Sequence, residues 1–397
     1  SGMITRIEVS TPDIENTYLD IDPETKHGFL IDPGAAPDQI ADAIRSGGFT
    51  IEKILLTHGH FDHIGAIDAI REEVVTSTTT YIGTDGNLLE ESPKNCNVLQ
   101  VNNPILTNTD LLKIKNMKVD GFKVEVVPIV YYKNTSLERA IDRLFVEVDR
   151  AYREGVNILI LSDRGVDENH VAIPSLLAVS ALQQHLVKTK KRTAVAMILE
   201  SGEPREVHHF ATLLGYGACA INPYLAQDTV KQLVDEHMLD KDYYAAVQDY
   251  NAAILNGIVK IASKMGISTI QSYEGSKIFE AIGINKDVID KYFTNTVSPI
   301  GGITLEDIAD DVNELHSAAY DPLGLETDLT LDSRGRHKMR SGADPHLYNP
   351  ATIHLLQEAT KRGDYELFKQ YTELVNKEER ERSEEHTSEL QSPLNLV

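Results

Sequence analysis

Two short apolar runs near the middle of the chain set the pattern for the fold. They are residues 158–161 (ILIL) and 194–199 (AVAMIL), and each is followed by a charged turn and then by a segment with helical periodicity. Apolar runs of this length are typical of strands buried on both faces. Pro174 stands where a helix begins, since its missing N–H is not needed there. The stretch 157–226 therefore predicts consecutive β–loop–α units, and so an α/β fold with a parallel sheet.

Polar residues follow these runs directly. In parallel α/β sheets the chemistry is carried at the carboxyl ends of the strands. The candidate residues at these ends are Ser162, Asp163, Arg164, Asp167, Glu168, Glu200, Glu203 and Arg205. For Asp163, Arg164, Asp167 and Glu168 two interpretations stay open: a polar surface that contacts neighbouring domains, or a solvated loop held by salt bridges.

The apolar spacing predicts further elements on both sides of this stretch. Helices are expected over 137–155, 243–265, 276–282, 286–293, 350–360 and 365–376, with strands over 123–130, 218–221 and 268–271. Thr304, with Asp307 three residues on, is expected to open one more helix. Two of these helices have a face that is expected to be buried. In the helix at 137–155 it consists of Leu137, Ile141, Leu144, Val148 and Ala151. In the helix at 243–265 it consists of Ala253, Ile254, Ile258 and Ile261.

The first 65 residues form a separate pattern. Strands at 4–9, 17–22 and 28–32 and a helix at 37–46 lead to a strand at 51–56 that is expected to be buried. This strand runs directly into THGHFDH, residues 57–63. Two histidines at i and i+2 place both imidazoles on one side of a loop, and the Asp–His pair turns a second set of ligands toward a neighbouring ion. The candidate metal ligands are His58, His60, Asp62 and His63, which suit zinc or iron.

On these residues the segment 3–65 resembles the start of a metallo-β-lactamase-superfamily hydrolase. The resemblance implies that His58 and His60 serve one metal and that Asp62 and His63 serve a second. It also implies a third histidine, a bridging aspartate and a final histidine, but the next histidine after His63 is His170. The segment is therefore expected to be a truncated, β-rich piece with a residual half-site for metal.

A second resemblance covers most of the remaining chain. It rests on LSDRGVDENHVAIPSLLAVSA, ESGEPREVHHFATLLGYGACAINPYLA and SKMGISTIQSYEGSKIFEAIG. These segments resemble the central domain of the glutamate synthase large subunit, from about residue 70 to about residue 376, which implies a barrel-like parallel β/α domain. The expected boundaries are 1–66 for the hydrolase-like segment, 67–319 for the central domain, 320–381 for the lead-in to the FMN-binding domain and 382–397 for a non-native or disordered tail.

The glutamate synthase resemblance implies a reaction shared between several domains. An amidotransferase domain releases ammonia from glutamine, and a tunnel carries the ammonia to an FMN site. There 2-oxoglutarate is converted to glutamate with electrons from a [3Fe-4S] cluster, while the central domain links the two ends and helps to wall the tunnel. This sequence lacks the nucleophilic cysteine, the flavin-contacting barrel and the cluster cysteines, so we expect no catalytic residue and no bound cofactor in it.

The same resemblance implies which partners this fragment has. They are the amidotransferase domain, the FMN barrel or the small subunit, and the fragment is expected to be inactive alone. Two rival functions stay open. One is a metal-dependent hydrolase that uses the H-x-H-x-D-H motif, and the other is an α/β scaffold that docks other glutamate synthase domains in trans.

Composition narrows the partners further. The net charge of −23 argues against nucleic acid and anionic membranes, which both reward Lys and Arg. No apolar run approaches the ~20 residues that crossing a bilayer requires. Two cysteines cannot form a disulfide framework or ligate an iron–sulfur cluster alone. These features are typical of a cytoplasmic protein.

Three smaller features each have two interpretations. Gly215 and Gly217 either cradle a phosphate or make a tight turn into the strand at 218–221. Of His208 and His209, one is expected to be buried and hydrogen-bonded and the other exposed, since neighbours on a helix point about 100° apart. Cys219 is expected to be a buried thiol rather than a nucleophile.

The junction and the tail predict an unusual origin for the chain. The two resemblances change over within about residues 65–71, without a linker rich in Pro, Ser or Gly. We therefore hypothesise a chimera, either artefactual or in-frame. A nucleotide sequence that resembles a sequencing-library adapter encodes residues 382–392, RSEEHTSELQS, so this segment is expected to be non-native. The alternative interpretation is a disordered acidic tail.

Overall fold

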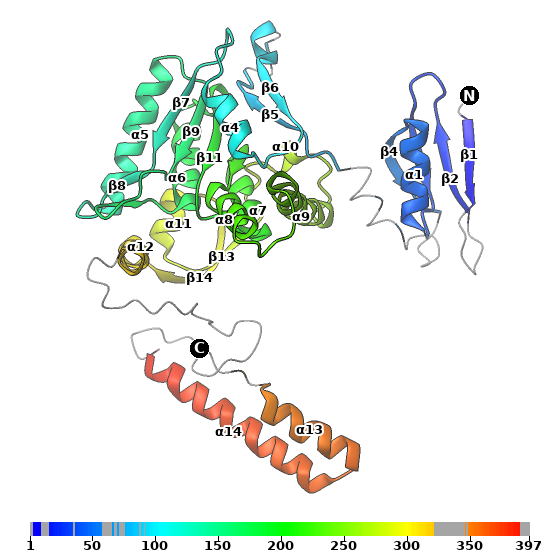
Figure 1. Cartoon of the computed structure of the whole chain (residues 1–397), viewed down its shortest axis with the longest axis vertical. Helices are drawn as coiled ribbons and strands as arrows, with labels where there is room; N and C mark the ends of the chain where they lie inside the picture. Colours follow the sequence, from blue (N-terminus) through cyan, green and yellow to red (C-terminus); the bar gives the residue numbers. More distant parts are fainter. Residues whose placement is uncertain are drawn as a thin grey trace. The chain divides into compact units, whose positions relative to one another are not determined.

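The computed structural model describes residues 3–8, 16–34, 36–57, 66, 70, 76–86, 89–90, 92–320, 346 and 348–389. The chain divides into two compact units, residues 1–320 and 321–397. The first unit contains a small N-terminal sheet and a larger α/β region, and the second contains two helices (Figure 1).

The N-terminal sheet has the strand order β1-β2-β3-β4. Its strands are β1 (Met3–Glu8), β2 (Asn16–Ile21), β3 (His27–Ile31) and β4 (Thr50–Leu55). The first three pair antiparallel, and β4 joins β3 in parallel after the helix α1 (Pro37–Gly47). A hydrophobic cluster holds the sheet to the helix, and its buried members are Leu19, Ile21, Leu30, Ile40, Ile44, Ile51, Ala66 and Ile70.

The strand expected at 51–56 is present as β4, but the expectation that it is buried is wrong. Ile51 is buried, but Leu55 and Leu56 are 43% and 46% exposed. The reason is that β4 is an edge strand, which pairs with β3 and with no other strand that the structure describes. Ala66, the last residue of the expected hydrolase-like segment, and Ile70, which follows the expected boundary, both pack into the N-terminal cluster. The Ala66 N–H donates to the Pro33 carbonyl over 3.0 Å.

The centre of the α/β region is a parallel sheet with the strand order β12-β11-β9-β7 (Figure 1). Its strands are β7 (Val124–Pro128), β9 (Ile158–Ser162), β11 (Ala196–Glu200) and β12 (Ala220–Asn222). All residues of β9, β11 and β12 are buried, as their apolar runs predict. The α/β class with a parallel sheet is confirmed. A barrel is not, because the described strands form an open sheet that ends at β7 and β12.

Alternate residues of the two central strands enter different hydrophobic clusters, because successive side chains of a strand point to opposite faces. One face carries Leu159, Leu161, Met197 and Leu199, which pack with the helices α5 (Leu137–Arg153), α6 (Ser175–Lys188) and α7 (Val207–Gly215). The opposite face carries Ile158, Ile160, Ala196 and Ile198, which pack with residues of β5 (Thr80–Gly83) and α4 (Asn108–Lys115). The sheet is therefore covered on both sides.

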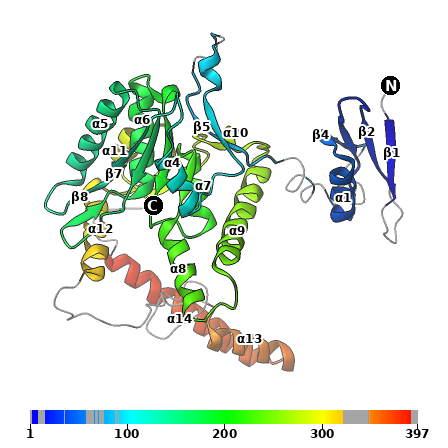
Figure 2. The same ribbon diagram turned by 45° about the horizontal axis from the view of Figure 1, so that its top comes forward.

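The helix periodicity is confirmed for α5, whose five expected core residues are all buried. It is confirmed only in part for α9 (Tyr243–Lys264), where Ile254 and Ile258 are buried but Ala253 is exposed. Figure 2 shows α9 beside α8 (Tyr224–Asp235). The other described elements here are η2 (Pro93–Cys96), β6 (Val98–Val101), β8 (Val130–Tyr132), β10 (His170–Ala172), η3 (Arg192–Ala194) and α10 (Ile270–Tyr273).

Two expected elements after residue 265 are wrong. The expected strand at 268–271 is a single bridge between Ser77 and Thr269, after which α10 turns Ile270 and Tyr273 into the core. The expected helix at 276–282 is instead β13 (Glu280–Ile284), which pairs in parallel with β14 (Val297–Ile303). The tertiary partner of β13 overrides local helix preference there.

The other expected elements near this sheet are present. The helix α11 (Lys286–Tyr292) connects β13 to β14, and α12 (Leu305–Ala319) follows with Thr304 and Asp307 in a capping box.

The second unit is a helical hairpin. Its helices are α13 (Pro350–Arg362) and α14 (Tyr365–Glu389), and Gly363 between them has a φ of +63°. Asn349 caps α13 by accepting hydrogen bonds from the Ala351 and Thr352 N–H groups. Both helices begin where the sequence predicts, but α14 continues well past Asn376, into the residues that resemble an encoded adapter.

Candidate functional site

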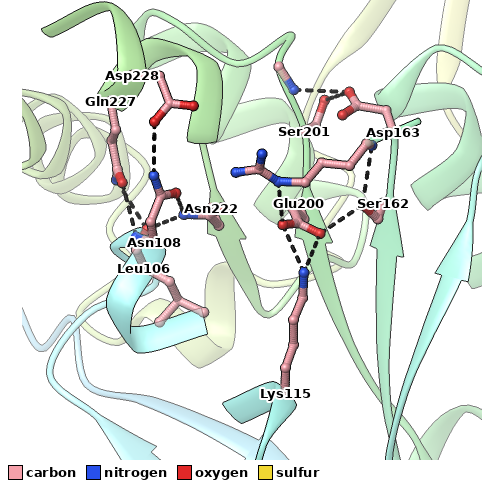
Figure 3. Close-up of polar contacts among 12 residues, drawn as sticks. Leu106, Asn108, Lys115, Ser162, Asp163, Glu200, Ser201, Asn222, Gln227 and Asp228 are labelled. Carbon is pink, nitrogen blue, oxygen red and sulfur yellow. Dashed lines mark hydrogen bonds and ion pairs between the residues drawn. The ribbon is translucent and has the colours of Figure 1, made fainter. Parts of the chain in front are cut away.

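The strands β9, β11 and β12 of the parallel sheet each end in a polar residue, and β7 ends in Pro128. The strand register aligns Pro128, Ser162, Glu200 and Asn222 across β7, β9, β11 and β12. The row therefore follows from pairing, although its members are far apart in the sequence. We name it, with the side chains that contact it, the strand-end network (Figure 3).

Glu200 is the centre of the strand-end network. It is 2% exposed, and the Lys115 ammonium lies 2.9 and 2.7 Å from its two carboxylate oxygens. The Ser162 hydroxyl donates to Oε2 over 2.7 Å, and Nε of Arg164 donates to Oε1 over 2.8 Å. Burial alone would raise the pKa of Glu200, but these donors outweigh it and hold the pKa below the ordinary glutamate value. The carboxylate is thus ionised and fully paired.

Asp163 and Arg164 form the outer layer of the same network. Asp163 is 5% exposed, and its Oδ2 accepts from the Ser201 hydroxyl over 2.7 Å and from the Gly202 N–H over 2.9 Å. Its Oδ1 has no hydrogen-bond partner among the residues that the structure describes. The Arg164 guanidinium lies over the Tyr224 ring at 3.9 Å. These contacts hold the loop after β9 against the end of β11.

A set of carboxamides continues the network toward β12. The Asn222 amide donates to the Leu106 carbonyl and to Oδ1 of Asn108, each over 3.0 Å. Gln227 donates to the same carbonyl over 3.1 Å and accepts from the Asn108 N–H over 3.1 Å. Asp228 accepts from the Asn108 amide over 3.1 Å. The loop before α4 is thereby fixed to the sheet, which places Lys115 beside Glu200.

Four of the sequence-predicted strand-end residues come together in this network, namely Ser162, Asp163, Arg164 and Glu200. The other four do not. Asp167 and Glu168 are exposed in the loop after β9, Glu203 accepts hydrogen bonds from the N–H and hydroxyl of Ser175, and the Arg205 N–H donates to the ring of His209.

Sequence reasoning missed one of the two cations of the network, Lys115, and its three amide side chains, those of Asn108, Asn222 and Gln227. Lys115 contacts a residue 85 positions away, and Asn108 one 119 positions away. A charged residue at the end of a short helix carries no local sign of such a partner. Only Asn222 had a usable signal, because it directly follows an apolar run.

The helix α12 is attached to the loop after β9. Nε2 of His316 lies 2.7 Å from the Asp167 carbonyl oxygen, and the Tyr320 hydroxyl donates to the Val166 carbonyl over 3.0 Å. The two rings stack on each other at 4.7 Å. The last turn of α12 is therefore tied to the segment that begins with Asp163.

The predicted metal ligands cannot be placed. His58, His60, Asp62 and His63 lie outside the described residues, as does most of the predicted junction. The strand that leads into the motif, β4, is present. Within the described part of the chain, no group of three or more His, Cys, Asp or Glu side chains is arranged to hold a metal ion.

The glycine turn before β12 has no room for a phosphate. A Cβ added at Gly217 would lie 2.6 Å from the Gln183 side chain, and one added at Gly215 would lie 2.6 Å from Phe279. Gly217 has a φ of +119°, and its N–H bonds the Leu214 carbonyl over 3.1 Å. The tight-turn interpretation is therefore correct.

Cys219 is buried, whereas the neighbouring histidines His208 and His209 are exposed and half-buried. Cys219 is 3% exposed, its thiol donates to the Met197 carbonyl over 3.1 Å, and burial raises the pKa of this thiol to about 12. His209 is half-buried and accepts hydrogen bonds from the Arg205 and Glu206 N–H groups, while His208 is exposed. None of these side chains has the environment of a nucleophile.

Comparison with known proteins identifies relatives of most of this chain. The model of the glutamate synthase central domain family matches residues 65–285. The chain belongs to this family. The glutamate synthase [NADPH] large chain of Bacillus subtilis is 47% identical over 312 residues, which cover 79% of this chain and 20% of that protein. The glutamate synthase [NADH] of Schizosaccharomyces pombe is 39% identical over 313 residues, covering 77% and 15%.

The chain spans about a fifth or less of the length of these two relatives. One solved structure, the B3 metallo-β-lactamase BLEG-1, is 36% identical over 18% of this chain and 32% of its own, with a TM-score of 0.17. That score does not define a shared fold. No helix within the described ranges is both long and apolar enough to cross a membrane.

Proposed function

We propose that this chain supplies the central, linking domain of a glutamate synthase large chain and has no activity alone. The observation that carries the proposal is the family match over residues 65–285, with 47% identity to the Bacillus large chain. In the whole enzyme the reaction would convert glutamine and 2-oxoglutarate to two glutamates. This domain would connect the amidotransferase and FMN-binding domains and help to wall the ammonia tunnel, and the enzyme would be cytoplasmic.

The strand-end network supports a linking rather than a catalytic role. Glu200 is ionised and takes its hydrogen bonds from Lys115, Ser162 and Arg164, so it is not available as a general base. The network instead fixes the geometry of the sheet edge. A rigid edge of this kind would suit a domain that fixes the amidotransferase and FMN-binding domains in a constant relative position.

The residues present do not fit the cofactors of the parent enzyme. The glycine turn at 215–217 is filled by the side chains of Phe279 and Gln183, which leaves no cradle for the FMN phosphate. The buried thiol of Cys219 is hydrogen-bonded to a backbone carbonyl, and the chain has one other cysteine, Cys96. A [3Fe-4S] cluster needs more thiolates than that. We therefore propose that FMN and the cluster bind elsewhere in the large chain.

A hybrid enzyme tests this function. Residues 77–320 of this chain would replace the matching segment of the Bacillus subtilis large chain, with its small subunit present. We expect the hybrid to form glutamate from glutamine and 2-oxoglutarate, and the chain of 397 residues to form none and to purify without flavin. One FMN per chain in the purified protein, or a folded, flavin-loaded hybrid that forms no glutamate, would contradict the proposal.

The second candidate function is a metal-dependent hydrolase in residues 3–65. The observation in its favour is that β4 leads directly into the H-x-H-x-D-H motif. A working two-metal site needs further ligands from later in the domain, and the following residues match a different family from position 65 onward. We expect metal analysis of the full chain to give well under one ion per chain. A full equivalent of zinc or iron that His60→Ala removes would favour the hydrolase.

We further propose that residues 3–65 and the central domain come from different parents. The change of resemblance without a linker supports this, as does the tail at 382–392. Long sequencing reads of the source DNA across codons 60–80 test it. A single unbroken read through both parts would refute an assembly artefact and leave an in-frame fusion.

A further inference from the structure

The two-stranded sheet β13–β14 exposes an apolar face. Ile282 is 67% exposed, Val297 61%, Ile300 42% and Ile303 41%. Ile282 and Ile300 are direct partners in the strand register, as are Ile284 and Ile303. Parallel strands are almost always covered on both faces in proteins, because their apolar side chains point to both sides. This face is therefore the kind of surface that another polypeptide covers.

The outer edge of this sheet is also open. Among the described strands, β14 pairs with β13 and with no other. Gly301 lies on β14, and a Cβ added there would meet no atom within 4 Å. An incoming strand could therefore approach the β14 backbone closely. An extended segment that adds to this edge gains main-chain hydrogen bonds as well as apolar contacts.

A negatively charged hollow lies at the carboxyl end of both strands. Its volume is about 610 Å³, and its lining includes Asn285, which follows β13, and Thr304, which follows β14. Four carboxylates line it, from Glu138, Asp287, Glu306 and Asp310, against one ammonium, that of Lys291. Lys291 is already hydrogen-bonded to Glu138 over 2.6 Å. The remaining carboxylates favour a basic side chain in the hollow.

We propose that β13–β14 is the docking surface for an extended apolar segment with a basic flanking residue, supplied by the part of a glutamate synthase large chain that follows the central domain. The proposal rests on the proposed function. The central-domain family match ends at residue 285, so β14 and α12 lie beyond it, toward the following part of the large chain. The net charge of −23 disfavours a second copy of this chain as the occupant.

Variants of the full chain test the docking surface. The probe is the C-terminal remainder of the Bacillus subtilis large chain, beginning where its match to this chain ends. We expect wild type to bind this probe and the I282K/I300K variant to bind at least ten-fold more weakly, because two apolar contacts are replaced by charges. The control is Leu112→Lys on α4, where the side chain is also exposed (58%) and lies outside the surface.

A second pair of measurements isolates the role of charge and of folding. E306Q/D310N should bind several-fold more weakly than wild type at low salt and show a flatter salt dependence. The unfolding midpoint of I282K/I300K should equal that of wild type, since both side chains are already exposed.

Three results would overturn the docking surface. They are equal binding by I282K/I300K and wild type, no binding of the probe by wild type, and a dimer of the full chain that I282K/I300K converts to a monomer. The hybrid enzyme separates this failure from failure of the proposed function. A hybrid that forms glutamate equally well with and without I282K/I300K would refute the surface and keep the function.

Discussion

Replacing Lys115 with methionine tests the strand-end network most directly. The methionine keeps an apolar stem of similar length, so the change removes the ammonium and little else. Glu200 is left with a side chain that is 3% exposed and with donors only from Ser162 and Arg164. An ionised carboxylate that loses a close cation in such a site destabilises the fold.

The size of the loss follows from burial. Removing one partner of a fully buried ion pair costs roughly 3–5 kcal/mol. Lys115 is 25% exposed, and two donors to Glu200 remain, so we expect a loss of about 2–3 kcal/mol in the free energy of unfolding. Lys113 on the same helix is the matched control, because its side chain is 73% exposed and its nearest carboxylate oxygen, on Asp110, is 3.7 Å away. Lys113→Met should change stability by less than about 0.5 kcal/mol.

The assay is urea unfolding followed by circular dichroism, at neutral and at acid pH. The folded-state pKa of Glu200 is lowered, so its stabilising contribution is present above the ordinary glutamate pKa and is lost as the pH falls through the lower folded-state value. The difference between wild type and Lys115→Met should therefore shrink in acid. Equal losses for the Lys113 and Lys115 variants, or a difference that grows in acid, would refute the account of the network.

Three further predictions concern single sites. Gly217→Ala should destabilise the fold by at least about 2 kcal/mol, because the residue has a positive φ and an added Cβ would clash with Gln183. Gly155→Ala should cost about 1 kcal/mol, because Gly155 has a φ of +85° but open space around it. Equal losses of the two variants in urea unfolding would contradict this. In a Cys96→Ala background the thiol of Cys219 should react with a disulfide reagent only on unfolding, and rapid labelling of the native chain would refute its burial. Burial raises the pKa of Glu274 to about 8, so its stabilising contribution is complete below the ordinary glutamate pKa and is lost as the pH rises through about 8. Glu274→Gln should remove this trend from the pH dependence of the unfolding midpoint. An unchanged pH profile in this variant would refute the prediction.

The elements that the sequence predicts correctly are those whose burial is indicated by the local spacing of apolar residues. The runs at 158–161 and 194–199 contain only apolar residues and so predict the buried strands β9 and β11. The helix α5 shows its buried face at helical spacing. The prediction at 276–282 fails for the opposite reason, although the helix α11 that follows is predicted correctly. The conformation of β13 is set by its pairing with β14, which no local pattern records.

The candidate site divides in the same way. Glu200, Ser162, Asp163 and Arg164 are predictable because they end apolar strands that meet at one edge. A further partner that holds Glu200 in its ionised form is Lys115, which comes from a helix 85 residues earlier in the chain. Sequence position alone cannot join them, because the contact depends on how the loop before α4 is held by Asn222 and Gln227.

The attachment of α12 to the loop after β9 has a mechanical consequence. His316 and Tyr320 are hydrogen-bonded to the backbone carbonyl groups of Asp167 and Val166. These carbonyl groups lie only a few residues beyond Asp163. A displacement of the last turn of α12 relative to the sheet would have to break these two hydrogen bonds or move that loop with it. The last turn of α12 is in this way coupled to the loop at the carboxyl end of β9, where the strand-end network lies.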